Sequence, residues 1–235
     1  MGCAFCASTI HGLTRNLTTG EIAAQVIGIA DFLRQEGARV DTIVVMGSGE
    51  PLENYDHVMA ALRLLHEDYT LGLSYRGITL STSGIVPGMR RLAEEGLPIS
   101  LSVSLHAPTE ELRSRLMPVN RIYSLAEVLR AAQYYAKITK RRVTYEYILI
   151  RDVNDGVREA EQLACLLRGQ LASVNLIPIN PVEERQFHRP EKHAIRRFRR
   201  ILEERHITVT LRREMGTDIQ AACGQLRNRL LAAGL

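Results

Sequence analysis

The feature that most constrains this chain is a regular alternation of short apolar runs with amphipathic segments. Apolar runs rich in β-branched residues stand at 40–46, 78–80, 99–105, 143–150, 174–179 and 207–211. Segments with helical periodicity lie at 18–36, 55–67, 86–95, 125–137, 157–167, 191–205 and 219–231. Because strands and helices alternate in this way in βαβ units, the pattern predicts right-handed crossovers and a parallel sheet.

The alternation continues along the whole chain, and no linker, internal repeat or low-complexity segment interrupts it. A chain of 235 residues, 46% of them hydrophobic, is long enough to bury one substantial core. It supplies about five parallel strands and a sixth, shorter one, which is too few for a closed eight-stranded barrel. We therefore predict a single α/β domain over residues 1–235 with the architecture of an open, partial TIM-like barrel.

The composition narrows the class of protein. The formal net charge is +4, which permits an anionic partner without requiring one. Four cysteines (Cys3, Cys6, Cys165 and Cys223) do not make a secreted disulfide framework in a chain this long, which favours a reducing setting. No apolar run approaches the ~18 residues of a membrane span, and no signal peptide is visible. We expect a cytoplasmic monomer without membrane attachment.

Two cysteines, Cys3 and Cys6, open the chain, with Phe5 directly before the second. Their spacing fits half of a zinc site, a redox pair or the end of an iron–sulfur loop, and the cysteines alone do not decide among these. A zinc module is the weakest reading because no second CxxC or histidine pair stands at zinc spacing. Cys165 lies in the amphipathic segment 157–167, where we expect it to pack rather than react.

Polar residues gather where the predicted strands end. They stand at 47–51, 81–84 and 104–106, and at Asn180. Ligands bind at this edge in parallel α/β architectures, because the loops that leave the strands converge there. Taken singly, Glu50 reads as a solvated loop carboxylate and His106 as a core histidine. Four such positions on one rim favour a binding site instead.

Several motifs together resemble one enzyme family. They are Cys3-Ala4-Phe5-Cys6, Met46-Gly47-Ser48-Gly49-Glu50-Pro51-Leu52, Ser81-Thr82-Ser83-Gly84-Ile85-Val86-Pro87, Ser104-Leu105-His106-Ala107-Pro108, Asn175-Leu176-Ile177-Pro178-Ile179-Asn180-Pro181, Gly216-Thr217-Asp218-Ile219 and Ala221-Ala222-Cys223-Gly224-Gln225-Leu226. This set is similar to the RlmN and Cfr methyltransferases of the radical S-adenosylmethionine (SAM) superfamily. The resemblance covers nearly the whole chain, from Gly2 to about Leu226.

The resemblance implies a [4Fe–4S] cluster held by three thiolates, with SAM on the open iron. Cys3 and Cys6 match two of the three ligands. Gly49 and Glu50 match the positions that hold the methionine end of SAM, where a carbonyl and a carboxylate suit an ammonium group. The other positions that match SAM contacts in the family are Ser81, Ser104, Leu105, His106 and Asn180.

Cys223 matches the family's methyl carrier, although a lone cysteine between small residues would by itself read as core. In the family a first SAM methylates this sulfur, and a second supplies the radical that lets the S-methyl carbon add to an adenine ring carbon. The implied enzyme methylates an adenine of 23S ribosomal RNA through S-methylcysteine. The sequence around Glu50 resembles the type that modifies C2 rather than C8, and a tRNA adenine stays open as a second substrate. An electron donor such as flavodoxin or ferredoxin is the other implied partner.

The chain departs from the family at its start. The family pattern C-x3-C-x2-C places the first cluster cysteine two positions ahead of Met1. The family's first barrel strand, its N-terminal RNA-binding domain and an upstream carboxylate base also have no counterpart in this sequence. Its second catalytic cysteine has no match, and Met215 stands where many relatives carry a basic residue. Because two thiolates do not make a stable three-thiolate site, we expect residues 1–235 alone to bind iron poorly and to lack methylation activity.

Two alternative functions stay open on the sequence besides the zinc module, and so does the role of one charge run. A radical SAM enzyme of another reaction type, such as an activase, would keep the fold without needing Cys223. A non-catalytic RNA-binding remnant would bind RNA in a salt-sensitive way and form no SAM-dependent product. The densest charge run, 189–200, is either a solvated helix face or a phosphate-contacting surface, which Arg212 and Arg213 would extend toward Cys223.

Overall fold

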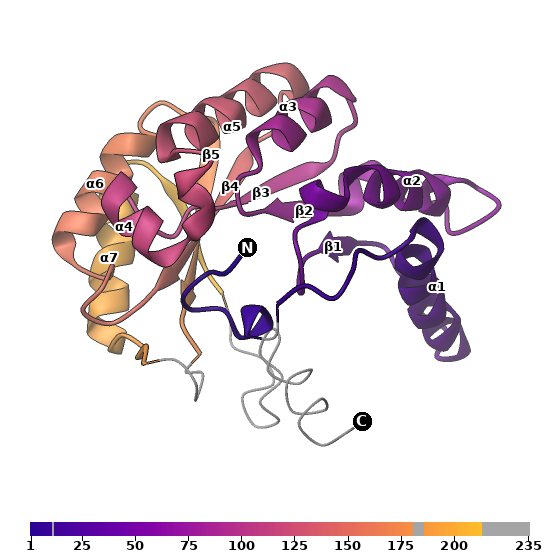
Figure 1. Cartoon of the computed structure of the whole chain (residues 1–235), viewed down its shortest axis with the longest axis horizontal. Helices are drawn as coiled ribbons and strands as arrows, with labels where there is room; N and C mark the ends of the chain where they lie inside the picture. The colour runs from indigo at the N-terminus through magenta and orange to yellow at the C-terminus, as the bar shows by residue number, and fades with distance from the viewer. Residues whose placement is uncertain (11, 181–185, 213–235) are drawn as a thin grey trace.

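The computed structural model describes residues 1–10, 12–180 and 186–212, and its centre is a six-stranded parallel sheet (Figure 1). The strands are β1 (Ile43–Val45), β2 (Ile78–Thr82), β3 (Ser100–Ser104), β4 (Val143–Leu149), β5 (Ala172–Pro178) and β6 (Thr208–Leu211). They lie side by side in chain order, and every neighbouring pair is parallel. Strand order without reversal is the order of a barrel. Within the described residues the sheet is open at β1 and β6, so the predicted open α/β barrel is confirmed.

Helices follow the strands as the periodicity predicts. The described α-helices are α1 (Thr19–Gln35), α2 (Tyr55–His66), α3 (Val86–Glu94), α4 (Glu110–Leu116), α5 (Leu125–Thr139), α6 (Val157–Leu167) and α7 (Lys192–Glu204). Short 3-10 helices are η1 (Ala7–Thr9), η2 (Pro51–Asn54), η3 (Tyr75–Gly77) and η4 (Pro118–Arg121). The sequence did not predict α4, which is short and mostly charged, and the helix expected at 219–231 lies outside the described residues. No described helix is long and apolar enough to span a bilayer.

Local sequence signals explain where the longest helices begin. Thr18 caps α1 and exchanges hydrogen bonds with Glu21 in a capping box, and Ser124 and Glu127 do the same for α5. Each box satisfies backbone N–H groups that have no partner inside the helix. The helices form an outer layer around the curved sheet (Figure 1). The core therefore lies between the sheet and this layer.

The two faces of the sheet differ in chemistry. Side chains alternate between the faces along a strand. In β4, Tyr147 points to the helical layer, where its ring lies 5.2 Å from that of Phe198 on α7. Glu146 therefore points to the inner face, where it accepts hydrogen bonds from Ser102 Oγ (2.6 Å) and Asn175 Nδ2 (2.8 Å). The outer face is apolar, and the inner face of the open barrel carries a polar network.

Helix α1 departs from the prediction. Its periodic apolar set suggested one buried face, yet Ile29 and Phe32 are 57% and 60% exposed. The side chains that α1 buries are the small ones of Ala23 and Ala30. The physical reason is position, because α1 packs chiefly against α2 at the margin of the molecule (Figure 1).

The expectation that Cys165 packs in the core is wrong, because its side chain is exposed. Helix α6 buries Ala160, Leu163, Ala164 and Leu167, which form one stripe at helical spacing. Position 165 lies about 100° around the helix from position 164, outside that stripe. The pattern of small and apolar neighbours alone did not separate these two positions.

Candidate functional site

The loops that follow β1, β2 and β3 meet at the C-terminal edge of the sheet, where the sequence predicts a site. Gly47 and Gly49 follow β1 with φ values of +126° and +101°. Side chains other than glycine rarely adopt this backbone region, so the turn into η2 depends on these two glycines. Ser48 Oγ reaches Ser8 Oγ at 3.5 Å, which brings this turn beside the segment that carries Cys3 and Cys6.

Glu50 is the most fully hydrogen-bonded carboxylate of this rim. It is buried, and it accepts from Thr82 Oγ1 (2.8 Å), from the N–H and Oγ of Ser83 (2.7 and 2.8 Å) and from the N–H of Leu52 (3.1 Å). These four donors fill about the four lone-pair positions that a carboxylate has. Burial raises the pKa of Glu50, and the hydrogen bonds from Ser83 and Thr82 oppose that rise. Glu50 thus fastens the loop after β1 to the end of β2.

Arg113, on α4, is completely buried in the same region. Its Nη2 donates to the carbonyls of Ser83 (2.7 Å) and Ser104 (3.2 Å), and its Nη1 donates to Asn120 Oδ1 (2.7 Å). Burial lowers the pKa of Arg113 to about 10. One side chain therefore joins the ends of β2 and β3. The sequence prediction missed Arg113 because an arginine on a charged segment reads as solvent-exposed.

His106 directly follows β3 and has a left-handed backbone, with φ of +60°. Its Nδ1 accepts a hydrogen bond from the N–H of Ile148 (3.0 Å), so that nitrogen carries no proton and the neutral ring has its proton on Nε2. Burial lowers the pKa of His106 to about 3, with the charge of Arg113 as a second cause. The site therefore holds a neutral imidazole that can donate through Nε2 and does not act as an acid or base near neutral pH.

Asn154 holds the backbone of His106 in place. Its buried side chain donates from Nδ2 to the carbonyls of His106 (2.9 Å) and Ile148 (2.6 Å), and its Oδ1 accepts from the N–H of Ile150 (2.7 Å). On the other side, the carbonyl of Glu146 accepts from the N–H of His106 at 3.3 Å. The sequence prediction also missed Asn154, because Asn-Asp before a glycine is an ordinary loop signal.

The segment with Cys3 and Cys6 folds as a tight turn against this rim. The N–H of Cys6 donates to the carbonyl of Cys3 (3.2 Å), and the N–H of Ala4 donates to the carbonyl of Leu116 (2.9 Å). The ring of Phe5 meets that of His106 edge-on, with centroids 5.0 Å apart. Phe5 therefore places the two cysteines beside the strand ends.

The donor set of the turn fits two corners of an iron–sulfur cluster. Burial is the main cause that raises the pKa of the Cys3 thiol to about 11, and the neighbouring Cys6 raises it further. A metal cation favours the thiolate forms that this environment disfavours. Among the described residues no group of three histidine, cysteine or acidic side chains could hold a metal ion. A cluster on three thiolates would thus need a thiol beyond Cys3 and Cys6.

The structure brings most of the predicted site residues to one rim. The predicted residues on this rim are Cys3, Cys6, Gly49, Glu50, Ser81, Ser104, Leu105, His106 and Asn180. Leu105 is fully buried, so only its backbone can meet a ligand, whereas Asn180 is half-buried just after β5. Cys223, the predicted methyl carrier, lies outside the described residues, as do Arg213 and Met215.

Comparison with known proteins gives consistent results. Residues 1–164 match the profile of the Radical SAM superfamily. Over 97% of its length the chain is 65% identical to a probable dual-specificity RNA methyltransferase RlmN of Symbiobacterium thermophilum, and 52% identical to one of Desulforamulus reducens. It spans 62% and 65% of the lengths of these two relatives.

Solved structures resemble the chain in fold as well. A radical SAM methyltransferase from Sphaerobacter thermophilus superimposes with a TM-score of 0.93 at 50% identity, over 95% of this chain and 66% of that one. The SuiB protein of Streptococcus suis, solved with bound SAM, gives a TM-score of 0.65 over 90% of this chain and 47% of its own. At 14% identity, that second likeness concerns the fold alone.

Gly84 should resist substitution because the rim closes around it. It has φ of +106°, and an added Cβ would lie 2.8 Å from Val128 Cγ2 and 3.1 Å from Arg113 Nη2. We expect Gly84→Ala to lower the free energy of unfolding by roughly 2–4 kcal/mol, from backbone strain plus overpacking, in urea titrations. Gly96→Ala is the matched control, because Gly96 also has a positive φ of +65° but open space around it. Equal losses in the two variants would contradict the close packing at Gly84.

The buried neutral state of His106 should make the fold acid-sensitive. Its folded pKa of about 3 lies below the usual 6.5, so the unfolded chain takes up the proton first as the pH falls. The contribution of His106 to the free energy of unfolding is fully present above pH 6.5. Between pH 6.5 and 3 the free energy of unfolding should decrease by about 1.4 kcal/mol per pH unit. The slope should shrink by that amount in His106→Gln. Parallel slopes for wild type and His106→Gln would show that His106 titrates normally.

Proposed function

We propose that this chain, which belongs to the Radical SAM superfamily, is the catalytic part of an RNA adenine methyltransferase of the RlmN type. The observation that carries the proposal is the contact of Phe5 with His106, because it sets the CxxC turn on the rim formed by Glu50, Ser104 and His106. A cluster and the SAM bound to it need that arrangement. The chain spans about two thirds of its RlmN relatives, so the activity proposed is that of the longer protein.

The rim residues would hold SAM through complementary polar groups. The methionine ammonium would lie between the Gly49 carbonyl and the Glu50 carboxylate, where it would take the place of the Ser83 hydroxyl as a donor to Glu50. Hydroxyl groups of Ser81 and Ser104, the amide of Asn180 and the Nε2–H of His106 would meet the ribose and the adenine edge. Leu105 would contribute its backbone. Because His106 is neutral, it adds a directed hydrogen bond and no charge.

Cys3 and Cys6 would be two of the three cluster ligands. A [4Fe–4S] cluster bound there would supply single electrons for the reduction of SAM. The turn around Ala4 and the ring of Phe5 would orient the two thiolates toward the rim. The thiolate sulfur of Cys223 would attack the methyl carbon of SAM, with S-adenosylhomocysteine as the leaving group, and would carry the methyl group to the substrate.

The substrate proposed is an adenine of 23S ribosomal RNA, methylated at C2. A tRNA adenine is the second substrate that the name "dual-specificity" of the relatives suggests. A flavodoxin- or ferredoxin-type protein would deliver the electron. We place the enzyme in the cytoplasm as a monomer.

Cys223 gives the sharpest test of the reaction type. In the longer, cluster-loaded protein, Cys223→Ala should abolish adenine methylation, measured by mass spectrometry of digested RNA, because the methyl group loses its carrier. Cys165→Ala is the matched control, since its exposed thiol on α6 has no proposed role. Methylation that survives in Cys223→Ala would instead favour a radical SAM enzyme of another reaction type.

Because only two thiolates, those of Cys3 and Cys6, are assigned as cluster ligands, we expect incomplete cluster uptake. Residues 1–235 alone, treated anaerobically with iron and sulfide, should take up clearly less than one [4Fe–4S] cluster per chain by visible absorbance and iron analysis, because two thiolates leave a third iron without a protein ligand. The longer protein should take up about one cluster per chain. A full cluster and active methylation from residues 1–235 would contradict this expectation.

A further inference from the structure

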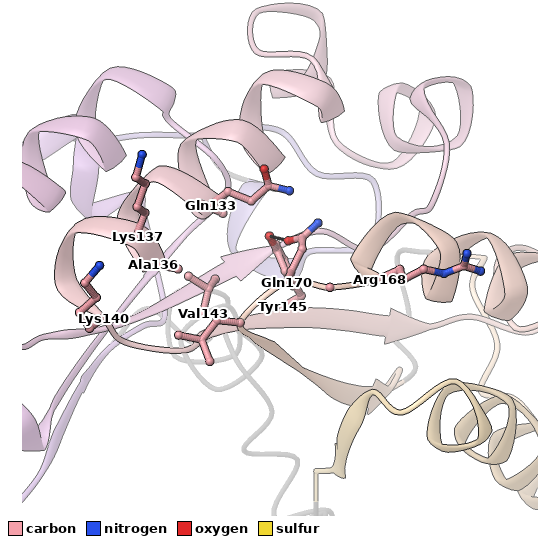
Figure 2. A pocket seen from close by; sticks show the side chains of 11 residues that line it. Gln133, Ala136, Lys137, Lys140, Val143, Tyr145, Arg168 and Gln170 are labelled. Atoms are coloured by element: carbon pink, nitrogen blue, oxygen red, sulfur yellow. Dashed lines mark hydrogen bonds between the residues drawn. The ribbon is translucent and has the colours of Figure 1, made fainter.

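A basic cleft lies at the edge of the sheet opposite the proposed SAM rim. Its volume is about 470 Å³, and it is formed by the end of α5, the start of β4 and the loop between α6 and β5. In Figure 2, Lys137 and Lys140 stand on one side and Arg168 on the other, with Gln133 and Gln170 between them. None of the proposed site residues lines this cleft. It is therefore a separate feature of the surface.

The charges of the cleft all have one sign. Lys137, Lys140 and Arg168 are exposed, no carboxylate lines the cleft, and none of the three forms an ion pair within the described part of the chain. Like charges around a concave surface attract anions and concentrate them there. Arg142, also exposed, follows Lys140 by two positions and adds to this potential.

The basic run at 189–200, noted in the sequence, differs from the cleft because some of its arginines on α7 are paired with carboxylates. On α7, Arg199 pairs with Glu203 (2.7 Å) and Arg200 with Glu204 (3.5 Å), each one helical turn apart. These pairs reduce the positive potential of that face, so α7 is weaker as a phosphate-binding surface than its composition suggests. Arg197 of the same helix lines a second pocket together with Asp152, Asp155, Glu159 and Glu191, whereas no carboxylate lines the cleft.

The floor of the cleft is fixed before any ligand arrives. Tyr145 is buried and donates from its hydroxyl to Gln170 Oε1 (2.9 Å), and Gln170 Nε2 donates to the carbonyl of Leu166 (2.7 Å). Val143 is buried beside them. The floor beneath the cations therefore needs no rearrangement before an anion binds.

We propose that this cleft binds phosphate groups of the RNA backbone, at a distance from the adenine that reacts. The inference rests on the proposed function, since it assumes an RNA substrate. Lysine and arginine contacts to phosphate position a nucleic acid and add salt-sensitive affinity, but they do not select sequence. The cleft would therefore strengthen RNA binding and orient the RNA, and the methylation itself would take place at the rim.

The geometry sets how far the RNA must extend. Strand β4 runs from Val143 at the cleft to Leu149 near the rim, and seven strand residues cover roughly 20 Å. At 3.4 Å per nucleotide along one strand, this span corresponds to about six nucleotides. In stacked RNA, phosphates that occupy the cleft would lie at least that many nucleotides from the target adenine. A short RNA would be modified without reaching the cleft.

The test uses the longer, cluster-loaded protein and two ribosomal RNA fragments. One fragment carries the target adenine within extended flanking RNA, and the other is cut to about five nucleotides on either side. The triple variant Lys137→Gln, Lys140→Gln, Arg168→Gln is compared with wild type and with Arg199→Gln, Arg200→Gln as the control of paired arginines. Affinity is measured by fluorescence anisotropy over a series of salt concentrations.

On the long RNA, the slope of log affinity against log salt should fall by about 0.7–0.9 for each cation removed, hence by roughly 2–3 in the triple variant. The arginine control should change the slope by less than half as much. On the short RNA the triple variant should bind and methylate like wild type, which would leave the proposed function intact. Single variants should give about one third of the change each.

Equal slopes for wild type and triple variant on the long RNA would overturn the inference. Inorganic phosphate provides a second arm, measured by protection of the three cations from chemical modification. Protection by phosphate with no change in the RNA slope would assign the cleft to a small anion and also overturn it. Loss of methylation on both RNAs would likewise count against a role confined to backbone binding. Failure of wild type to bind either RNA would overturn both the cleft and the proposed function.

Discussion

The rim depends on one residue, Ser83, that lies between two buried charged side chains. Ser83 gives its N–H and hydroxyl to the Glu50 carboxylate, and its carbonyl accepts from the Arg113 guanidinium. A buried charge is costly unless hydrogen bonds replace the water around it. Ser83 supplies such hydrogen bonds to both the Glu50 carboxylate and the Arg113 guanidinium. The loop after β1, the end of β2 and helix α4 are thereby held together. The turn with Cys3 and Cys6 then rests on α4 through Leu116, so the position of both cysteines depends on this arrangement.

A second set of contacts fixes the end of β3 against β4. The left-handed residue His106 is held by Glu146, Ile148 and Asn154 through main-chain and side-chain hydrogen bonds. The same residue meets Phe5 from the cysteine turn. The turn is therefore bound from two directions, by α4 below and by the imidazole beside it. A site for a reactive ligand requires this rigidity, because its donors must be in place before the ligand arrives.

The sequence predicted those parts of the molecule that depend on hydrophobic periodicity and on the residues that bound each segment. Apolar runs located all six strands, and helical periodicity located the described α-helices other than α4, since both signals are local in the chain. It did not predict Arg113 or Asn154, whose partners lie up to 30 and 48 residues away, nor the exposure of Phe32 at the margin of the fold. Such features depend on which elements become neighbours, and the order of residues does not show that directly. The rim was predicted because all strand ends of a parallel sheet face the same edge, whereas the roles of its residues came from family resemblance.

The strands of the sheet differ in how extensively they are paired and buried, and this difference decides where local unfolding begins. β1 contributes three residues, pairs only with β2 within the described chain and leaves Val44 64% exposed. β4, in contrast, is paired along both sides and almost wholly buried. Local unfolding begins where few buried contacts resist it. The α1–β1 margin of residues 1–235 can thus unfold locally while β2 to β5 stay intact. Of the rim, only the loop after β1 would follow this motion, up to Glu50, which is hydrogen-bonded to the end of β2.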